Sequence, residues 1–339
     1  MKDDSVHLPP DVVCVGETMA VLSPPTATPL DRQTHLALTV GGAESNVACT
    51  LAALGHRAAW VGRVGADPLG RRVLADLAAR GVDISSAETD TGRPTGVYFK
   101  DPGEEGTGTY YYRRDSAATA MSTALTALPL LENARILHLT GITAALSDTC
   151  AELVEAVVLH RKVPGPLISF DVNHRPALWR TDAAPALLTL ARAADLVFVG
   201  RDEAETLWNT GTADEIRALI PGPTLVVKDA SHGATVYEGE GVTGDETRTS
   251  TPYVPQEPTA FVPAPAARVV ERVGAGDAFA AGYLAAHLES RAPADALRLG
   301  HLAAAATLAT RADVPPPLTR TTLDDHLALD DAAWSALTL

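Results

Sequence analysis

A lone carboxylate follows three very small residues in the segment 271–279, which reads ERVGAGDAF. Gly274, Ala275 and Gly276 leave room for successive backbone N–H groups to approach an anion, and a helix after them adds its positive end. Asp277 stands at the edge of this cradle, where it could accept a proton from an attacking hydroxyl group. Phosphoryl transfer to an alcohol requires such a cradle beside a base.

The same carboxylate also has an ordinary interpretation. Asp is common at helix N-termini because its oxygens accept free backbone N–H groups and its charge suits the helix dipole. This segment alone does not separate a helix cap from a catalytic base.

Other nucleotide-binding and catalytic motifs do not fit the sequence. A P-loop needs a Gly-Lys pair, and no lysine of the chain follows a glycine. The dinucleotide fingerprint needs a third glycine where GAGDAF has Phe279. Neither H-E-x-x-H nor G-x-S-x-G occurs. We therefore expect a phosphate site of another kind.

Three segments, in order, resemble the ribokinase-like (PfkB) family of sugar kinases over nearly the full chain. VGGAESNVACTLAALG from Val40 is similar to the first family signature, and RVGAGDAFAAGYLAA is similar to the second. FVGRDEAE resembles the Asn-x-x-Glu region between them. Within the family, the segments TGVYF, YYYRRDSAA, LHLTGIT and FDVNHRPALW resemble 2-keto-3-deoxygluconate kinases. The resemblance implies an enzyme that uses ATP and Mg²⁺ to phosphorylate 2-dehydro-3-deoxy-D-gluconate to its 6-phosphate.

The resemblance also implies roles for individual residues. Asp277 would be the base, beside the cradle of Gly274, Ala275 and Gly276. The residues implied around the sugar acid are Gly42, Glu44, Asn46, Tyr98, Tyr111, Arg113, Ile142 and Arg175. Those implied around ATP are Asn173, Lys228, Ser231, Gly233, Gly274, Gly276 and His301. Glu203 would act indirectly on Mg²⁺.

Several of these residues have structural alternatives. The tyrosines 110–112 could be the ordinary aromatic surface of an edge strand. Arg175 precedes a proline and could bind a helix end, and Asn46 could be a polar residue in a first helical turn. Lys228 closes a predicted strand, where a solvated lysine is common.

The chain departs from the family pattern at four positions. Glu271 stands where Asp is usual, Gly200 replaces the Asn of Asn-x-x-Glu, Ala230 replaces a Gly, and His301 replaces an adenine-side Asn. These changes leave the strength of nucleotide and metal binding open. They also leave open a sugar-acid-binding protein that has lost turnover.

A second alternative is a sibling kinase for a neutral sugar such as fructose or ribose. Arg113 and Arg175 together favour an acidic substrate over a neutral one. The sequence does not separate the gluco from the galacto epimer.

Composition limits the partners of this protein. The chain has 339 residues with a net charge of −15, which argues against a nucleic-acid or anionic-membrane partner. Its three cysteines form no C-x-x-C pair. The first residues, MKDDSVHLPPDVV, do not resemble a signal peptide, and no apolar run approaches the ~20 residues that span a bilayer. We expect a cytoplasmic protein.

Short apolar runs alternate with helical patterns and must position these residues. Strands are predicted at residues 11–16, 58–65, 135–141, 166–173, 195–200 and 223–228, and helices at 45–54, 67–80, 148–161 and 183–192. This alternation predicts one α/β domain over residues 1–339 with a doubly wound, mainly parallel sheet. The polar segments 20–40 and 95–114 should form a small β-sheet lid, and residues 253–267 a loop. Family resemblance implies a homo-oligomer through that lid.

Overall fold

The alternating pattern folds into a three-layer α/β unit in the computed structural model, which describes residues 8–103, 106–239, 257–314 and 319–339. Its central sheet has the order β14-β13-β12-β11-β10-β9-β1-β4. Neighbouring strands run parallel from β4 to β12, whereas β13 and β14 are antiparallel. The strands are β1 Val12–Val15, β4 Ala58–Val61, β9 Ile136–Thr140, β10 Leu167–Asp171, β11 Leu196–Gly200, β12 Thr224–Asp229, β13 Gly233–Tyr237 and β14 Ala260–Val262.

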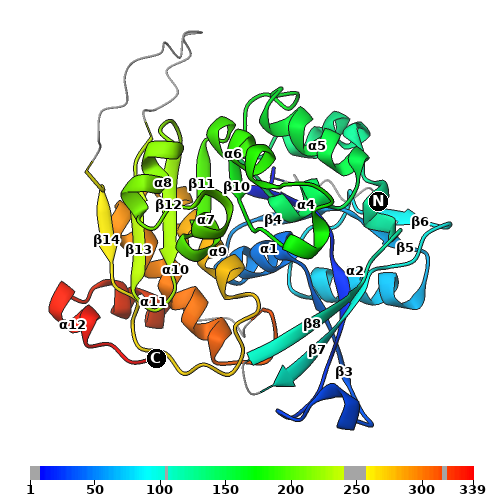
Figure 1. Ribbon diagram of the computed structural model, residues 1–339, viewed down its shortest axis with the longest axis horizontal. Helices are drawn as coiled ribbons and strands as arrows, with labels where there is room; N and C mark the ends of the chain where they lie inside the picture. The colour runs from blue at the N-terminus through cyan, green and yellow to red at the C-terminus, as the bar shows by residue number, and fades with distance from the viewer. Residues whose placement is uncertain (1–7, 104–105, 240–256, 315–318) are drawn as a thin grey trace, which may run out of the picture.

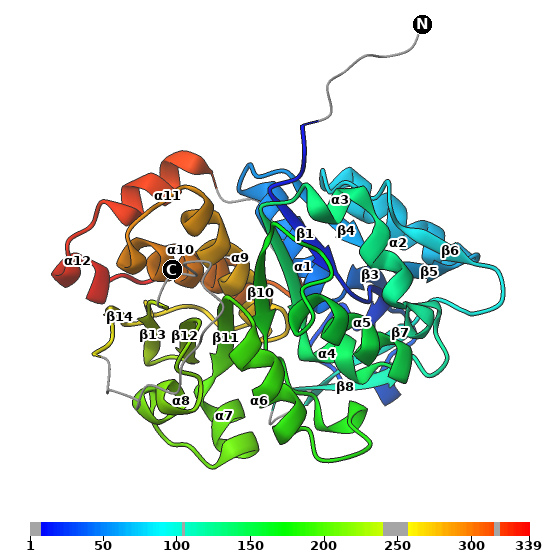
Figure 2. The same ribbon diagram turned by 90° about the horizontal axis from the view of Figure 1, so that it is seen from above.

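Helices cover both faces of this sheet (Figures 1 and 2). One face packs against α1 Ala43–Ala53, α2 Pro68–Ala79, α9 Ala275–Leu288 and α10 Pro293–Leu308. The other packs against α5 Asp148–Val158, α6 Ala184–Ala193 and α8 Ala213–Leu219. Because strand side chains alternate, Val12 and Cys14 of β1 enter the first core, while Val13 and Val15 enter the second. The predicted doubly wound α/β fold is confirmed.

The remaining helices are short and lie at the ends of strands or of the chain. They are α3 Pro129–Glu132, α4 Gly141–Ala145, α7 Arg201–Trp208, α11 Arg320–Leu327 and α12 Asp331–Ser335. None of the helices formed by the described residues has the length and apolar character that crossing a bilayer requires.

A second, four-stranded sheet projects from the main body beside α2 (Figure 1). Its order is β3-β2-β7-β8, with β2 Met19–Ser23, β3 Ala37–Gly41, β7 Val97–Gly103 and β8 Gly106–Tyr112. The two polar segments therefore form the predicted small sheet, although residues 104–105 lie outside the described part.

Three local predictions needed correction. The strand predicted at 58–65 divides into β4 and β5 Arg63–Gly65, and β5 pairs with β6 Glu88–Asp90 instead of extending the central sheet. The predicted loop 253–267 contains β14, an edge strand of three residues, while 253–256 lie outside the described residues. The helix predicted from residue 45 begins at Ala43, because Gly42 is its N-cap.

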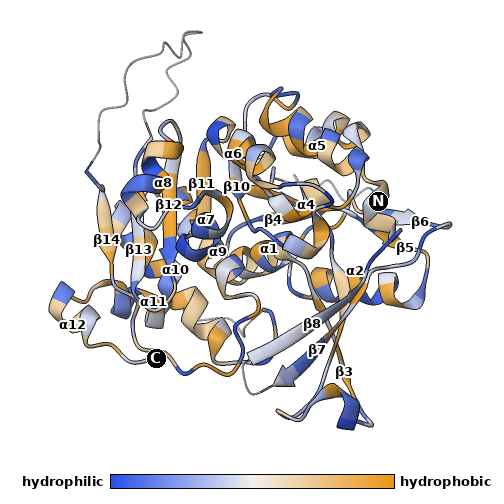
Figure 3. Cartoon of the chain, in the orientation of Figure 1, coloured by the Kyte–Doolittle hydropathy of each residue, from blue (hydrophilic) through white to orange (hydrophobic). Residues whose placement is uncertain are grey.

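Hydropathy follows this architecture (Figure 3). Strand β12 is apolar along most of its length and turns hydrophilic at its end, where Lys228 and Asp229 lie. Strand β8 is paler, and the tyrosines 110–112 are exposed. The polar ends of the parallel strands therefore meet at one edge of the central sheet, where open α/β sheets bind ligands.

Candidate active site

A cavity of about 570 Å³ lies at this edge, between the carboxyl ends of the strands and the small sheet. Its lining combines residues that lie far apart in the sequence. Gly42 and Asn46 come from the start of α1, Tyr98 and Tyr111 from the small sheet, and Asp277 from α9. Ile142, Arg113, Arg175, Glu203 and Gly274 also line it.

The Gly274–Gly276 segment forms the first turn of α9 as the sequence predicts. Gly274 is the N-cap and has φ 86°, a left-handed conformation that favours glycine. A Cβ atom at Gly274 would lie 2.4 Å from the carbonyl oxygen of Asp313, so space as well as backbone conformation requires a glycine here. The segment places the N-terminus of α9, a helix of 14 residues, at the cavity. Helix N-termini in this position bind anions.

Asp277 is held by two side-chain amides. Its carboxylate accepts hydrogen bonds from Asn46 Nδ2 at 2.8 Å and Asn173 Nδ2 at 3.5 Å. Among the described residues no helix N–H donates to this carboxylate, so it is not acting as the N-cap of α9.

Burial raises the pKa of the Asp277 carboxyl to about 7, although the hydrogen bond from Asn46 opposes this shift. The charge of Asp171 raises the pKa further, while those of Arg175 and Lys228 lower it. A carboxyl that titrates near neutral pH is well matched to general base catalysis.

Arg113 lies buried in the cavity wall with a partner that the sequence did not reveal. Its Nη2 is paired with Oε2 of Glu17, and Glu17 Oε1 accepts a hydrogen bond of 2.6 Å from Ser116 Oγ. The guanidinium lies 5.5 Å from the centre of the Tyr111 ring. Its Nε has no hydrogen-bond partner among the described residues. Glu17 therefore orients Arg113, while the Nε–H is left without a partner among the described residues.

Lys228 and Glu203 form a charged group on the floor of the cavity. Lys228 Nζ donates to Asp171 Oδ2 at 2.8 Å, and a Cβ at Gly276 would lie 3.6 Å from Nζ. Burial alone would lower the pKa of Lys228, but the charges of Asp171 and Glu203 raise it. Burial, followed by the charge of Asp171, raises the pKa of Glu203. Lys228 is thus a paired cation beside the cradle, not a solvated strand end.

A second cavity, of about 720 Å³, opens on the other side of the cradle. The predicted nucleotide residues Ser231, Gly233 and His301 line it, together with Ala275. His301 is buried, which lowers its pKa to about 4, and its Nε2 lies 3.1 Å from the Val262 carbonyl oxygen. His301 is therefore neutral near pH 7 and donates this hydrogen bond within the cavity wall. Asn173, also predicted on the nucleotide side, lines the first cavity instead.

Two predicted substrate residues occupy unexpected places. Glu44 does not line either cavity; it is fully buried and accepts hydrogen bonds from Thr140 Oγ1 at 2.8 Å and Thr143 Oγ1 at 2.6 Å. Arg175 reaches the cavity rim but is exposed, and its Nη1 donates to the carbonyl of His174 at 3.0 Å.

Among the described residues, no three His, Cys, Asp or Glu side chains are grouped so as to hold a metal ion. Glu203 Oε1 accepts the His174 N–H, and Oε2 accepts the Gly200 N–H at 3.1 Å. A divalent ion here would need phosphate oxygens and water as additional ligands, which is the usual manner of Mg²⁺ binding.

Sequence reasoning missed several charged residues of this region, among them Glu17, Lys100, Asp171 and Asp313. For Asp171 and Glu17 the sequence contains a signal that could have identified them. Asp171 ends β10, and Glu17 follows β1 by two residues. Polar residues directly after parallel strands point to a ligand site.

Comparison with known proteins gives a consistent result. Residues 9–319 match the sequence model of the pfkB family of carbohydrate kinases. The chain is 34% identical over 331 residues to a 2-dehydro-3-deoxygluconokinase of Bacillus subtilis, covering 94% of this chain and 95% of that protein. It is 31% identical over 329 residues to a 2-dehydro-3-deoxygalactonokinase of Haloferax volcanii, covering 93% and 95%. A crystal structure of a PfkB protein from Polaromonas sp. JS666 superposes with a TM-score of 0.78 at 31% identity, covering 93% and 99%.

The backbone at Ala230 gives a first prediction. Ala230 lines the second cavity with φ 45°, so an alanine occupies a left-handed conformation that costs about 1–2 kcal/mol. Ala230→Gly should raise the free energy of unfolding in urea by about 0.5–1 kcal/mol, since glycine's own entropic cost offsets part of the gain. Ala78→Gly, at an exposed position of helix α2, is the control and should lower the free energy of unfolding by a similar amount. A loss of stability in Ala230→Gly would contradict this account.

The Asp277 carboxyl gives a second prediction. Turnover should fall as the pH drops through about 7, because the protonated carboxyl cannot accept a proton. Asp171→Asn removes a negative charge that raises the Asp277 pKa and should move this limb of the pH–rate profile to lower pH. The exposed Asp325→Asn variant should leave it in place. A wild-type limb centred near pH 4 would refute the assignment.

Proposed function

The chain belongs to the pfkB family of carbohydrate kinases and is a phosphotransferase with an alcohol group as acceptor, and we propose that its substrate is a sugar acid. The proposed reaction converts 2-dehydro-3-deoxy-D-gluconate to its 6-phosphate with ATP as donor. The relatives that carry the gluconokinase and galactonokinase names support this class of substrate.

The observation that carries the proposal is the buried guanidinium of Arg113 in the first cavity. Its Nε lacks a partner among the described residues, as do Oδ1 of Asn46 and Oδ1 of Asn173. These three atoms offer one charged donor and two acceptors to a ligand. A polyhydroxylated carboxylate satisfies all of them, because it brings an anionic acceptor and several hydroxyl donors.

Asp277 would accept the proton of the sugar's primary hydroxyl as that oxygen attacks the terminal phosphorus of ATP. Asn46 and Asn173 would hold the carboxylate in position, since each donates an amide N–H to it. The N–H groups of residues 274–276 would stabilise the charge on the transferring group, and the paired ammonium of Lys228 lies beside them.

The residues on the nucleotide side fit ATP and Mg²⁺. The second cavity is bounded by small residues such as Ala264, Ala266 and Gly233, which suits a flat base. Glu203 and Asp171, which line the first cavity near Lys228, are two carboxylates that could hold Mg²⁺ through water, and the ion would neutralise phosphate charge during transfer.

One observation keeps a neutral sugar as the second candidate. Glu17 already pairs with Arg113, so part of the guanidinium's positive charge is neutralised before any substrate binds. A fructose-like substrate could use the remaining donor as a neutral hydrogen bond. Loss of turnover has no comparable support, because the cradle and the carboxyl with its raised pKa are both in place.

We also propose that the small sheet acts as a lid and mediates a homo-oligomer. Strand β8 is the edge of that sheet, and Tyr110 and Tyr112 are 54% and 68% exposed. Exposed aromatic residues on a sheet edge are typical of protein–protein contacts.

The role of Asp277 leads to a third prediction. Asp277→Asn should lower kcat by about 10²–10⁴-fold, because the amide cannot accept the proton. The melting temperature at pH 8 should be unchanged or higher, since the folded protein then no longer holds a carboxyl whose pKa burial raises. Turnover and calorimetric melting check both parts. A wild-type kcat would show that Asp277 has no catalytic role.

A fourth prediction concerns the substrate class. Arg113→Lys should raise KM for the sugar acid about 10- to 100-fold, because a charged hydrogen bond is worth about 1.5–3 kcal/mol. KM for ATP should change little. The exposed Arg180→Lys is the matched control.

The same assay should compare both epimers of the sugar acid with fructose and ribose. Sugar acids should be the efficient acceptors for the wild-type enzyme. If fructose or ribose is phosphorylated equally well, or Arg113→Lys has no effect, the neutral-sugar reading replaces the proposal.

A further inference from the structure

A buried lysine of the small sheet points away from solvent toward the cradle. Lys100 lies on β7, two residues after Tyr98, so both side chains leave the same face of the strand. Lys100 is 2% exposed and Tyr98 is 3% exposed, although the neighbouring strand β8 is largely exposed. Lysine is rarely buried unless its charge is paired.

Three oxygens surround the Lys100 ammonium. Its Nζ lies 2.5 Å from Asp313 Oδ1 and 4.0 Å from Glu271 Oε2, and it donates to the Arg311 carbonyl at 3.1 Å. Tyr98 donates its hydroxyl hydrogen to the other oxygen of Asp313. Burial, followed by the charge of Asp313, raises the pKa of the Tyr98 hydroxyl well above its ordinary value, which keeps it a donor.

Asp313 and Glu271 each contact backbone groups at or next to the cradle. Glu271 Oε1 accepts the N–H groups of Arg272 at 2.8 Å and Val273 at 3.3 Å, the two residues before Gly274. Asp313 packs its backbone against Gly274, where an added Cβ would lie 2.4 Å from its carbonyl oxygen. One ammonium from the small sheet therefore holds the two segments that flank the cradle.

The charges make this ammonium necessary for an anion site. Asp313 and Glu271 are both buried, so without Lys100 two carboxylates would lie together beside the place where phosphate oxygens bind. Like charges in a buried site repel each other and an incoming anion strongly. With Lys100 in place, Lys100, Asp313 and Glu271 together still carry one excess negative charge. Hydrogen bonds from the Tyr98 hydroxyl and from backbone N–H groups stabilise this charge.

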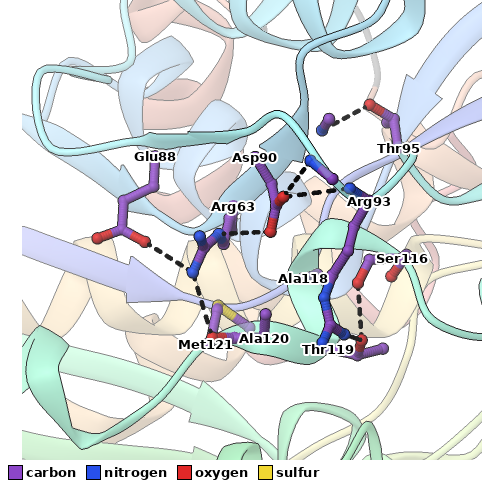
Figure 4. A network of polar contacts seen from close by, with 12 residues as sticks. Arg63, Glu88, Asp90, Arg93, Thr95, Ser116, Ala118, Thr119, Ala120 and Met121 are labelled. Carbon is purple, nitrogen blue, oxygen red and sulfur yellow. Dashed lines mark hydrogen bonds and ion pairs between the residues drawn. The ribbon is translucent and has the colours of Figure 1, made fainter.

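The base of the small sheet is attached independently (Figure 4). Thr95, just before β7, accepts the Gly65 N–H at 2.9 Å and donates to Asp67 at 3.0 Å. Arg63 Nε pairs with Asp90 at 3.2 Å, and Arg93 Nη1 donates to Thr119 Oγ1 at 3.2 Å. The residues just before β7 are thus held by contacts that do not involve Lys100.

We propose that Lys100 is a positioning residue for phosphoryl transfer: its ammonium fixes the Gly274–Gly276 cradle through Asp313 and Glu271. The cradle is then complete only while the small sheet, which also carries the substrate-facing Tyr98, is docked on the large domain. This inference rests on the proposed role of the cradle in binding the phosphates of the nucleotide.

The test compares three variants of Lys100 with the wild type. Lys100→Met should lower kcat/KM for ATP about 10- to 100-fold and weaken ADP binding in calorimetry by a similar factor. Dissociation of the sugar acceptor should change less than threefold. Lys162→Met, at an exposed loop lysine, is the matched control and should behave as the wild type.

Lys100→Ala leaves a hole lined by two carboxylates and a carbonyl, which a small cation can enter. Ammonium or potassium ions should therefore restore ADP binding and turnover of Lys100→Ala at least tenfold in a saturable manner. The same ions should not restore Lys100→Met, because the thioether fills the hole. A purely structural lysine would not show this difference.

The double variant Lys100→Met with Asp313→Asn removes the cation together with one carboxylate and guards against simple misfolding. It should fold, as judged by a cooperative thermal transition, and still bind ADP at least tenfold more weakly than the wild type. Wild-type ADP affinity in this folded double variant, or in Lys100→Met, would overturn the proposal. Absence of cation rescue in Lys100→Ala would also overturn it.

Because ADP binding is the main readout, the experiment remains decisive if no sugar acid proves to be a substrate. In that case the proposed function fails while the effect of Lys100 on the cradle is still measured.

Discussion

The structure depends on keeping one carboxylate, Asp277, in a water-poor site beside a cradle for anions. Desolvation makes its charged form costly, and this cost is what raises the pKa to about 7. The amide of Asn46 limits the shift by donating to the carboxylate, to which Asn173 also donates. The balance leaves a carboxyl that can hold or release a proton near neutral pH, which an exposed Asp could not do.

The surrounding residues position the Asp277 carboxyl and balance the charges near it. Gly274 lets α9 begin directly at the cavity, and Asn173 takes φ 39°, a left-handed conformation that asparagine tolerates, to aim its amide at Asp277. Three positive charges nearby are paired: Arg113 with Glu17, Lys228 with Asp171 and Lys100 with Asp313. Pairing lets an acidic chain concentrate cations around an anion site without leaving them unbalanced when the ligand is absent.

The fold and the centre of the site could be predicted because their signals are local. Alternating apolar runs predict the parallel sheet, and the small residues 274–276 predict the cradle. Family resemblance brought Asn46, Arg113 and Tyr98 to the cavity, where the structure places them. Glu44 does not line the cavity, because residues two apart on a helix point in nearly opposite directions and Asn46 takes the side that faces the cavity.

The ion pairs could not be predicted, since they join segments that are distant in sequence and lack periodicity. Asp313 follows α10 in an irregular stretch, and its distance from Lys100 depends on how the small sheet docks. The central claim, however, concerns one carboxyl group. An NMR titration of ¹³C-aspartate-labelled protein, with the Asp277→Asn spectrum identifying the resonance, measures its pKa directly. The account predicts a midpoint near pH 7 for the Asp277 carboxyl carbon, and a midpoint near 4, the ordinary value for an aspartate, would contradict it.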